Sequence, residues 1–343
     1  PLLAAAASAA ARGIVFHDAR SLEDAGRVTT AAVTTTGTIT RAELEVVEVH
    51  ALTREPLEPL VAYAASAEVA AGDHPIARAL RRYAQAHGIA PESVRRATHA
   101  PGRGVAATTT GGERLLVGNR QLLLGEGVSA AIAEADATRA EERGQTALFL
   151  ALGGKVRAVL ALRDEVRPGA RAAVQRLFDQ RAEVVLLSGD SRATVEALAR
   201  QVDVTNVKAE LLPEERGEEV RRLREQGVVA AVGVPGLDAP ALEAADVPVH
   251  LGAAGSPEVE RGVALTSHDI RDAAAALWIA GAARREAWRG LGIAVGVGGF
   301  LVATAALGWL PPAAAAVCAV GVDVIVLRAG ARLLRRTALR LPA

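Results

Sequence analysis

The segment VTTTGTIT at residues 33–40 sets the frame for the whole fold. Its β-branched residues are typical of a strand, and the glycine among threonines is typical of the loop that ends one. The segment carries several hydroxyls but no carboxylate. Threonine-rich strand ends are commonly structural, so the meaning of these hydroxyls depends on the loops that the fold brings beside them.

Further along the chain, short apolar strands alternate with amphipathic helices. We expect strands at 155–162 (KVRAVLAL), 183–187 (EVVLL) and 228–232 (VVAAV), and helices at 169–178, 192–201 and 214–226. Strands joined by crossover helices at this spacing predict a parallel sheet covered on both faces. The predicted class is therefore α/β, and the ligands of such sheets collect at the carboxyl ends of the strands.

Two of these strand ends carry small and acidic residues, namely LLSGDS at 186–191 and GVPGLDAPAL at 233–242. Small residues let a phosphate approach the backbone, and a helix that begins just after Asp190 points its N-terminal amides at an anion. Pro240 suits the first turn of a helix. Each loop alone is also an ordinary turn before a helix, so their order along the chain has to decide between these interpretations.

Length and composition limit the functional classes. With 343 residues the chain exceeds one typical domain, and its 39 basic and 39 acidic residues give no net charge. We therefore expect no nucleic acid as a partner. The single cysteine, Cys318, cannot form a disulfide within the chain. The chain begins at Pro1 and contains no methionine, which is typical of a piece of a longer protein.

The C-terminal part has the pattern of a membrane hairpin. Residues 290–310 (GLGIAVGVGGFLVATAALGWL) carry no charge over the length that a spanning helix needs, and the apolar run at 313–327 contains only Asp323. Arginines flank both open ends, which predicts a cytoplasmic position for each. A buried helical hairpin of a soluble protein is the alternative. An ionisable residue such as Asp323 at that depth is either functional or a polar packing group.

The order of four motifs along the chain gives a resemblance. VTTTGTIT, LLSGDS, LLPEER and VGVPGLDAPAL are similar to the strings DKTGTLT, TGDN, P-x-D-K and GDGxNDxPAL of heavy-metal-transporting P-type ATPases. The resemblance implies a haloacid-dehalogenase-like parallel-sheet domain with an inserted α+β nucleotide-binding domain and a C-terminal transmembrane helical hairpin. The family also implies ATP and Mg²⁺ as cofactors.

The insertion resembles the nucleotide-binding domain of these metal pumps. Its marks are Glu68, the string GDHPIA at 72–77, GRGV at 102–105 and VGNR at 117–120. The resemblance implies that the following residues surround the adenine of ATP: Glu68, His74, Pro75, Gly102, Gly104 and Asn119. A lone His-Pro pair is otherwise only a helix start, since proline suits a first turn.

The resemblance also implies domain boundaries. The expected units are the end of a preceding membrane helix or linker (1–13), a phosphorylation domain (14–48 and 153–270), a nucleotide-binding domain (49–152), a linker helix (271–289) and a transmembrane hairpin (290–336). We expect a cell membrane protein whose other domains are cytoplasmic. Its partners would be the lipid bilayer and an intact P-type ATPase or a missing N-terminal half.

The catalytic motifs depart from the family at several positions. Thr34 stands where the family has the aspartate that accepts phosphate, and Thr35 stands where it has the next lysine. Val234 and Leu237 replace an aspartate, which is a magnesium ligand, and an asparagine. The remaining candidates for the catalytic site are Thr36, Gly37, Thr38, Ser188, Gly189, Asp190, Arg216 and Asp238. Because both metal-holding carboxylates are replaced, we expect Mg²⁺ binding to be weakened.

The functional prediction follows from these losses. We expect the chain to bind ATP but to be defective in forming an aspartyl-phosphate at position 34, because a threonine hydroxyl is a poor nucleophile. The alternatives are a non-enzymatic nucleotide-sensing partner of an intact metal pump, a dehalogenase-superfamily phosphatase using Asp190 or Asp238, and a decayed copy. Cys318 and Asp323 are candidate ligands for a soft metal, although Cys318 is equally a small buried hydrophobe.

Overall fold

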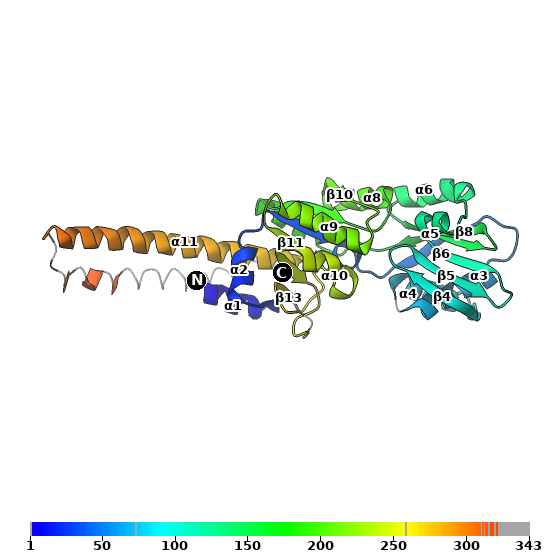
Figure 1. The fold of residues 1–343 in the computed structure, drawn as a ribbon, viewed down its shortest axis with the longest axis horizontal. Coiled ribbons are helices and arrows are strands. Elements are labelled where there is room, and N and C mark those ends of the chain that lie inside the picture. Colours follow the sequence, from blue (N-terminus) through cyan, green and yellow to red (C-terminus); the bar gives the residue numbers. More distant parts are fainter. Residues whose placement is uncertain are drawn as a thin grey trace.

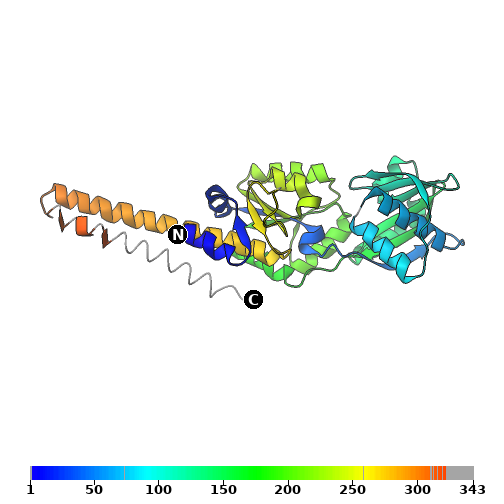
Figure 2. The ribbon, with the colours of Figure 1, turned by 90° about the horizontal axis from the view of Figure 1, so that it is seen from below.

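The body of the molecule consists of two β-sheet domains that lie side by side (Figure 1). The structure is a computed structural model that describes residues 2–309 apart from 73 and 258, and residues 311, 313–314, 316–318 and 320–321. The first domain holds a seven-stranded sheet and the second a six-stranded sheet. The long helix α11 (Ile270–Ala306) projects away from the first domain on the side opposite the second (Figures 1 and 2).

The seven-stranded sheet has the order β1-β13-β12-β11-β2-β9-β10, and only the β1–β13 pair is antiparallel. Its strands are β1 (Ile14–Phe16), β2 (Thr30–Thr34), β9 (Glu183–Leu187), β10 (Asn206–Lys208), β11 (Val229–Gly233), β12 (Val247–His250) and β13 (Val263–Leu265). Every residue of β2 is buried, including Thr30 and Thr34 at its two ends, as is expected of an inner strand that is covered on both faces. The α/β prediction is therefore confirmed.

Helices cover both faces of this sheet. On one face pack α1 (Leu2–Ala10), α2 (Ala19–Ala25), α7 (Ala170–Asp179), α8 (Arg192–Val202) and the first part of α11. On the other face pack α9 (Pro213–Arg224) and α10 (Pro235–Ala244). Successive side chains of β2 point to opposite faces of the sheet. Val33 packs in the core with α1, α2, α7, α8 and α11, and Ala32 packs in the core with α9 and α10.

The six-stranded sheet is antiparallel and has the order β3-β8-β7-β6-β5-β4. Its strands are β3 (Glu45–Ala51), β4 (Val94–Ala100), β5 (Gly104–Thr109), β6 (Arg114–Gly118), β7 (Thr146–Leu152) and β8 (Lys155–Arg163). One face carries α3 (Glu58–Ala71) and α4 (Pro75–Ala86), and the other carries α5 (Arg120–Gly125), η2 (Ala131–Ala133) and α6 (Glu134–Glu142).

The placement of residues 155–162 in the parallel sheet was wrong. These residues form β8, which pairs in antiparallel fashion with both β3 and β7. The two glycines Gly153 and Gly154 have φ of +60° and +78° and make the tight hairpin that joins β7 to β8. The six-stranded sheet therefore extends from Glu45 to Arg163, beyond the boundaries of 49 and 152 expected for the nucleotide-binding domain.

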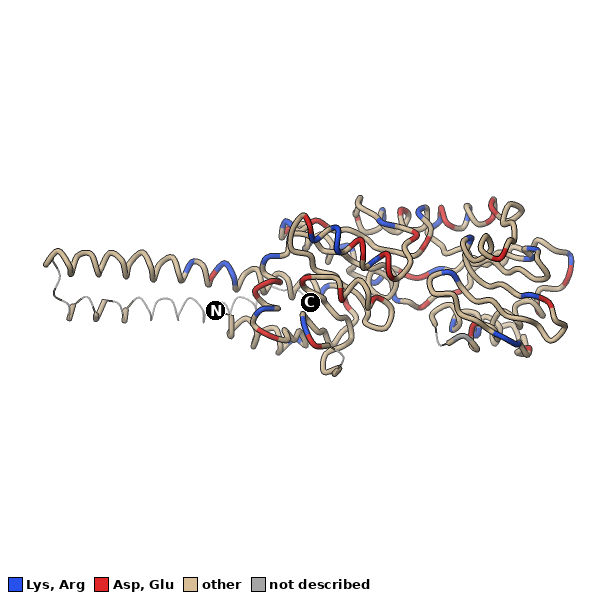
Figure 3. Tube along the Cα trace, in the orientation of Figure 1, with Lys and Arg blue, Asp and Glu red and all other residues tan. Residues whose placement is uncertain are grey.

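The expected linker helix and first membrane helix form one continuous element. Helix α11 has 37 residues, and its first four turns are buried in the core of the seven-stranded domain. Its outer part is the one described helix that is long and apolar enough to cross a membrane. Along this outer part, beyond Arg289, the trace carries no charged residue as far as the structure describes it (Figure 3). Asp323 and most of the second half of the predicted hairpin lie outside the described residues.

Candidate functional site

Three of the sequence motifs meet at one edge of the seven-stranded sheet. Thr34 ends β2, Ser188 follows β9, and the loop from Gly233 to Asp238 follows β11. The three strands are neighbours in parallel register, with Thr34 paired to Leu187 and Val33 to Val232. Parallel register brings all three carboxyl ends to the same edge, as the sequence predicted.

Thr34 is at the centre of a buried hydrogen-bonded cluster. Its side chain is 2% exposed, and its Oγ1 lies 2.8 Å from Asp238 Oδ2 and 2.9 Å from Thr38 Oγ1. A hydroxyl has one proton to donate, and the carboxylate is the stronger acceptor. The Thr34 hydroxyl therefore donates to Asp238 and accepts from Thr38.

Asp238 is held by three donors. Arg216 Nη1 donates to Oδ1 over 2.8 Å, while the Val234 amide (3.0 Å) and the Thr34 hydroxyl donate to Oδ2. Burial raises the pKa of Asp238 above its ordinary value, and the hydrogen bonds and the Arg216 charge oppose that rise. An amide and a guanidinium can only donate, so both favour the ionised carboxylate. Three of the four lone-pair sites of this carboxylate are therefore occupied by the protein itself.

These contacts do not suit a magnesium ion. Mg²⁺ prefers an octahedral set of oxygens that includes free carboxylates. The side chain of Thr34 offers only a hydroxyl oxygen, and the side chain of Val234 offers no oxygen. Asp238 is already paired with Arg216. Among the described residues there is no group of three or more His, Cys, Asp or Glu side chains that could hold a metal ion. The residues present at this edge of the sheet thus do not fit the divalent cation that the family implies.

A second hydrogen-bonded chain joins the two domains. Thr35 Oγ1 donates to Ser188 Oγ over 2.8 Å, and Ser188 Oγ donates to Asp190 Oδ2 over 3.1 Å. Thr146, on β7 of the six-stranded sheet, donates to Asp190 Oδ1 over 3.0 Å. Both oxygens of Asp190 are therefore engaged. Ser188 and Asp190, predicted as catalytic, lie beside Thr35 rather than Thr34 and connect the sheets.

A cavity of about 430 Å³ opens between the domains and reaches this edge. Its size falls in the range of small-molecule sites. All six residues that the family resemblance places around adenine line it: Glu68, His74, Pro75, Gly102, Gly104 and Asn119. Its other end is lined by Thr36, Gly189, Arg216 and Asp238. One cavity thus connects the expected purine residues with the expected phosphate residues.

The side chains at the purine end differ in what they contact. Glu68, on α3, is 4% exposed, and burial raises its pKa to about 7. His74 precedes α4, and its Nδ1 accepts from the Ile76 amide over 3.3 Å. Asn119 caps α5 and donates to Gly102 O over 3.0 Å, so it holds the glycine loop in place.

His99, on β4, also lines the cavity, although the sequence analysis did not predict it. The centroid of its ring lies 6.1 Å from that of His74.

The raised pKa of Glu68 predicts a pH-dependent stability. The folded chain binds this proton more tightly than the unfolded chain, whose glutamate titrates near 4.5. The bound proton contributes about 3 kcal/mol to the free energy of unfolding. This contribution is fully present below pH 4.5 and is lost as the pH rises through about 7. Glu68→Gln, which stays neutral, is expected to unfold at a higher temperature than the parent chain at pH 8 and at a similar temperature near pH 4.5.

The measurement is thermal unfolding of both chains from pH 4.5 to pH 8. Glu58→Gln, an exposed glutamate of the same helix, is the matched control and is expected to follow the parent chain at every pH. A gap between Glu68→Gln and the parent chain that does not change with pH would contradict the prediction.

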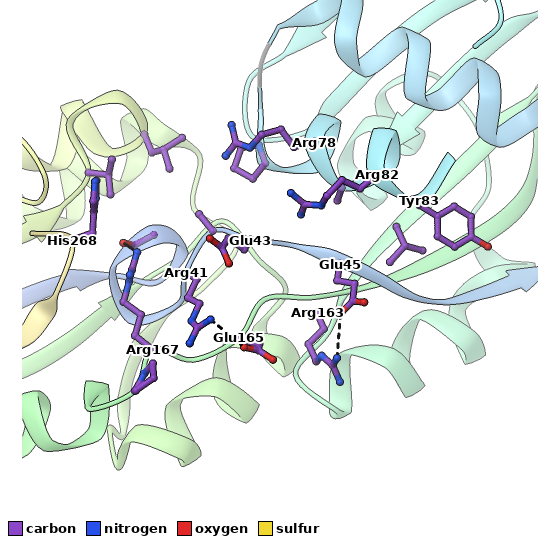
Figure 4. A pocket seen from close by; sticks show the side chains of 18 of the residues that line it. Arg41, Glu43, Glu45, Arg78, Arg82, Tyr83, Arg163, Glu165, Arg167 and His268 are labelled. Carbon is purple, nitrogen blue, oxygen red and sulfur yellow. Dashed lines mark hydrogen bonds and ion pairs between the residues drawn. The ribbon is translucent and has the colours of Figure 1, made fainter. Parts of the chain in front are cut away.

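A second, larger cleft of about 1520 Å³ lies along the two segments that connect the domains (Figure 4). Its walls alternate in charge, with Arg41 paired to Glu165 at 3.6 Å and Arg163 paired to Glu45 at 3.2 Å. Gly37 faces this cleft, and its carbonyl accepts from Arg167 over 3.2 Å. Gly37 is therefore not part of the nucleotide cavity.

Of the two predicted membrane ligands, Cys318 falls within the described residues, and it lines neither cavity. Cys318 is exposed in the described part of the chain, so its interpretation as a buried hydrophobe finds no support there. Asp323 lies outside the described residues. A metal-binding role for either residue stays a prediction.

Comparison with known proteins places these observations in a family. Residues 35–246 match the haloacid dehalogenase-like hydrolases. The chain is 34% identical over 310 residues to the probable copper-exporting P-type ATPase V of Mycobacterium tuberculosis, covering 88% of this chain and 40% of that protein. It is 29% identical over 329 residues to the copper-exporting P-type ATPase of Bacillus subtilis, covering 95% and 41%. The chain thus spans less than half the length of these relatives.

Solved structures agree with the sequence relatives. A zinc-transporting PIB-type ATPase in its E2.Pi state superposes with a TM-score of 0.67 at 29% identity, over 97% of this chain and 54% of that one. The catalytic domain of the CPx-ATPase CopB-B has the same fold, with a TM-score of 0.63 at 22% identity over 78% of this chain. The chain therefore belongs to the haloacid dehalogenase-like hydrolase family, and over most of its length it is similar in sequence and fold to a C-terminal portion of the heavy-metal P-type ATPases.

Proposed function

We propose that this chain is a nucleotide-binding part of a heavy-metal P-type ATPase that binds ATP between its two sheets and forms no aspartyl-phosphate at position 34. The observation that carries the proposal is the buried contact of the Thr34 hydroxyl with Asp238, which is itself paired with Arg216. The acceptor position therefore offers a hydroxyl in a closed cluster instead of a free carboxylate.

The chemistry of the cluster disfavours attack by Thr34. A hydroxyl needs a strong base beside it to become a nucleophile. Asp238 is adjacent and burial raises its pKa, but the Arg216 charge opposes that rise, and both carboxylate oxygens already accept hydrogen bonds from Arg216 and the Val234 amide. Thr35 supplies no positive charge where the family has a lysine. The lysine and the metal-binding carboxylates that stabilise a transferring phosphoryl group in the family are therefore both replaced at this end of the cavity.

The purine end supports nucleotide binding. A neutral Glu68 can donate to a ring nitrogen, and burial favours this neutral form by raising the pKa of the carboxyl to about 7. His74 and Pro75 begin helix α4 at the cavity wall, and the glycine loop after β4 brings backbone close to the ligand. ATP would lie with its base between these groups and its phosphates toward Arg216.

The position of the protein in the cell is part of the same proposal. The apolar outer part of α11 would lie in the bilayer, with the two sheet domains on the cytoplasmic side. The relatives are described as copper-exporting or zinc-transporting pumps, so a heavy-metal cation is the proposed cargo of the whole assembly. The assembly would include the lipid bilayer and either an intact P-type ATPase or a further segment that supplies the rest of the pump.

The experiment uses the full chain in detergent micelles. Calorimetry is expected to detect ATP binding that His74→Asn weakens about tenfold, because asparagine retains the helix cap but not the imidazole. His87→Ala, at the other end of α4, is the matched control and is expected to bind like the parent chain.

The same preparation tests the phosphorylation claim. After incubation with γ-labelled ATP and acid quenching, we expect no hydroxylamine-labile label on the chain. A labile acyl-phosphate that maps to this chain would refute the proposal, and so would a lack of nucleotide binding. An acid-stable, hydroxylamine-resistant label that maps to Thr34 would show a phosphate ester of its hydroxyl, which would also refute the proposed inertness of the cluster.

A further inference from the structure

We propose that Arg216 takes over the charge-neutralising task of the divalent cation, so that the cavity binds the phosphates of a nucleotide, or a free polyphosphate, without magnesium. This inference rests on the proposed function, because it assigns the phosphate end of the same cavity. It is carried by the contacts of Arg216 and by the state of every carboxylate around it.

The Arg216 guanidinium places a fixed positive charge at the phosphate end of the cavity. Arg216 lies in the first turns of α9, and its side chain is only 17% exposed. Its Nη1 forms the 2.8 Å ion pair with Asp238, which anchors the guanidinium plane at the edge of the sheet. A buried arginine is always charged and is ordered by this contact, so it is preorganised for an anion.

Part of this guanidinium still lacks an acceptor. Arg216 Nε is buried and has no hydrogen-bond partner among the described residues. An unsatisfied buried donor is costly, and the cost is recovered when an acceptor arrives. Arg216 lines the same cavity as Glu68 and His74, and its Nη2 lies beside Gly189, a position without a side chain. A phosphate oxygen that enters from the purine end would meet this Nη2 rather than the buried Nε, and the guanidinium can donate to it there.

Apart from Glu68 at the purine end, the acidic residues that line the cavity each accept a hydrogen bond from another part of the protein. Asp238 is bound by Arg216, Asp190 by Ser188 and Thr146, Glu141 by Arg120, and Glu210 by the Arg192 amide. Within the described chain these carboxylates form no cluster of three that could hold a cation. The phosphate end therefore offers a cationic donor to an anion and no free carboxylate set to a metal.

The test measures ligand binding to the full chain in EDTA and in excess Mg²⁺. The probes are ATP, adenosine and inorganic tripolyphosphate. We expect the ATP dissociation constant to differ by less than about threefold between the two conditions. Tripolyphosphate is expected to bind in EDTA, whereas adenosine is expected to be indifferent to Mg²⁺.

The variant is Arg216→Gln combined with Asp238→Asn, which removes both members of the ion pair and leaves no lone buried charge. It is expected to weaken ATP and tripolyphosphate about tenfold while adenosine binding is unchanged. Arg103→Gln, an exposed arginine of the same cavity, is the matched control for simple loss of charge and is expected to have a smaller effect.

The outcomes separate the two proposals. ATP that binds ten times more tightly with Mg²⁺ would overturn the inference and leave the nucleotide proposal standing. Equal losses for adenosine and ATP in the double variant, or equal losses in Arg103→Gln, would also overturn it. Tripolyphosphate binding that depends on Arg216 together with no binding of adenosine or ATP would support the anion site and refute the nucleotide proposal.

Discussion

Gly104→Ala is expected to abolish nucleotide binding and to cost the six-stranded domain about 4 kcal/mol or more of stability. Gly104 begins β5 with φ of +135°, a conformation that side chains rarely adopt. A Cβ at this position would lie 2.2 Å from Val117 O and 2.5 Å from Gly118 Cα. Both contacts are with backbone of the paired strand β6, so neither can be relieved by a change of rotamer.

Gly72 is the matched control for this prediction. It has a similar φ of +141°, and no heavy atom lies within 4 Å of its ideal Cβ in the part of the chain that the structure describes. Gly72→Ala therefore carries the backbone strain without the clash and is expected to cost about 1 kcal/mol. The parent chain, Gly104→Ala and Gly72→Ala are compared by thermal unfolding and by calorimetry of ATP binding. If both variants lose the same stability, the close approach of β5 to β6 is not the reason for the glycine.

Thr34→Asp, which restores the carboxylate that the family has, is expected to destabilise this chain by about 3 kcal/mol at pH 7 in EDTA. The new carboxylate would face Asp238, whose Oδ2 lies 2.8 Å from the present hydroxyl, in a site that is 2% exposed. Arg216 is a single cation and cannot neutralise both acids. One of them must bind a proton or remain uncompensated. The loss is therefore expected to shrink as the pH falls toward 4.

The control is Thr34→Asn, which has the shape of aspartate without its charge. It is expected to be more stable than Thr34→Asp at pH 7, with the two converging in acid, as followed by thermal unfolding. Excess Mg²⁺ is expected to stabilise Thr34→Asp more than the parent chain, because two facing carboxylates attract the cation. The aspartate alone is not expected to restore an acyl-phosphate, since Thr35 and Val234 are unchanged. Equal stability of the two variants at every pH would contradict the closed, buried description of the cluster.

Much of the parallel domain could be predicted from the sequence because its signals are local. Buried parallel strands read as short apolar runs, and the loops after β9 and β11 carry the small residues that mark a ligand edge. The assignment of 155–162 failed for a related reason. An apolar run of that length is compatible with either sheet, and only the Gly153–Gly154 hairpin signal tells the antiparallel pairing apart.

The sequence indicated residues that gather at the cavity and the sheet edge, but not how they contact one another. The six residues that the resemblance places around adenine line one cavity, and their contact with a purine stays a prediction. The bond from Thr146 to Asp190 and the pair between Arg216 and Asp238 join segments that are far apart in the chain. His99 occurs in a strand with no motif of its own. Side-chain contacts of this kind depend on how whole domains pack, so they cannot be predicted from a local sequence pattern.

Helix α11 gives the molecule a lever arm. Its 37 residues extend over about 55 Å. Its N-terminal part is buried in the core of the seven-stranded domain, whereas its C-terminal part is apolar and largely exposed. A domain tilt of about 5° would swing the tip of a rigid rod of this length by about 5 Å. The glycines from Gly290 to Gly299 make the outer arm more compliant than its alanine-rich root. A small tilt of the seven-stranded domain would thus appear as a larger displacement at the apolar end of the helix.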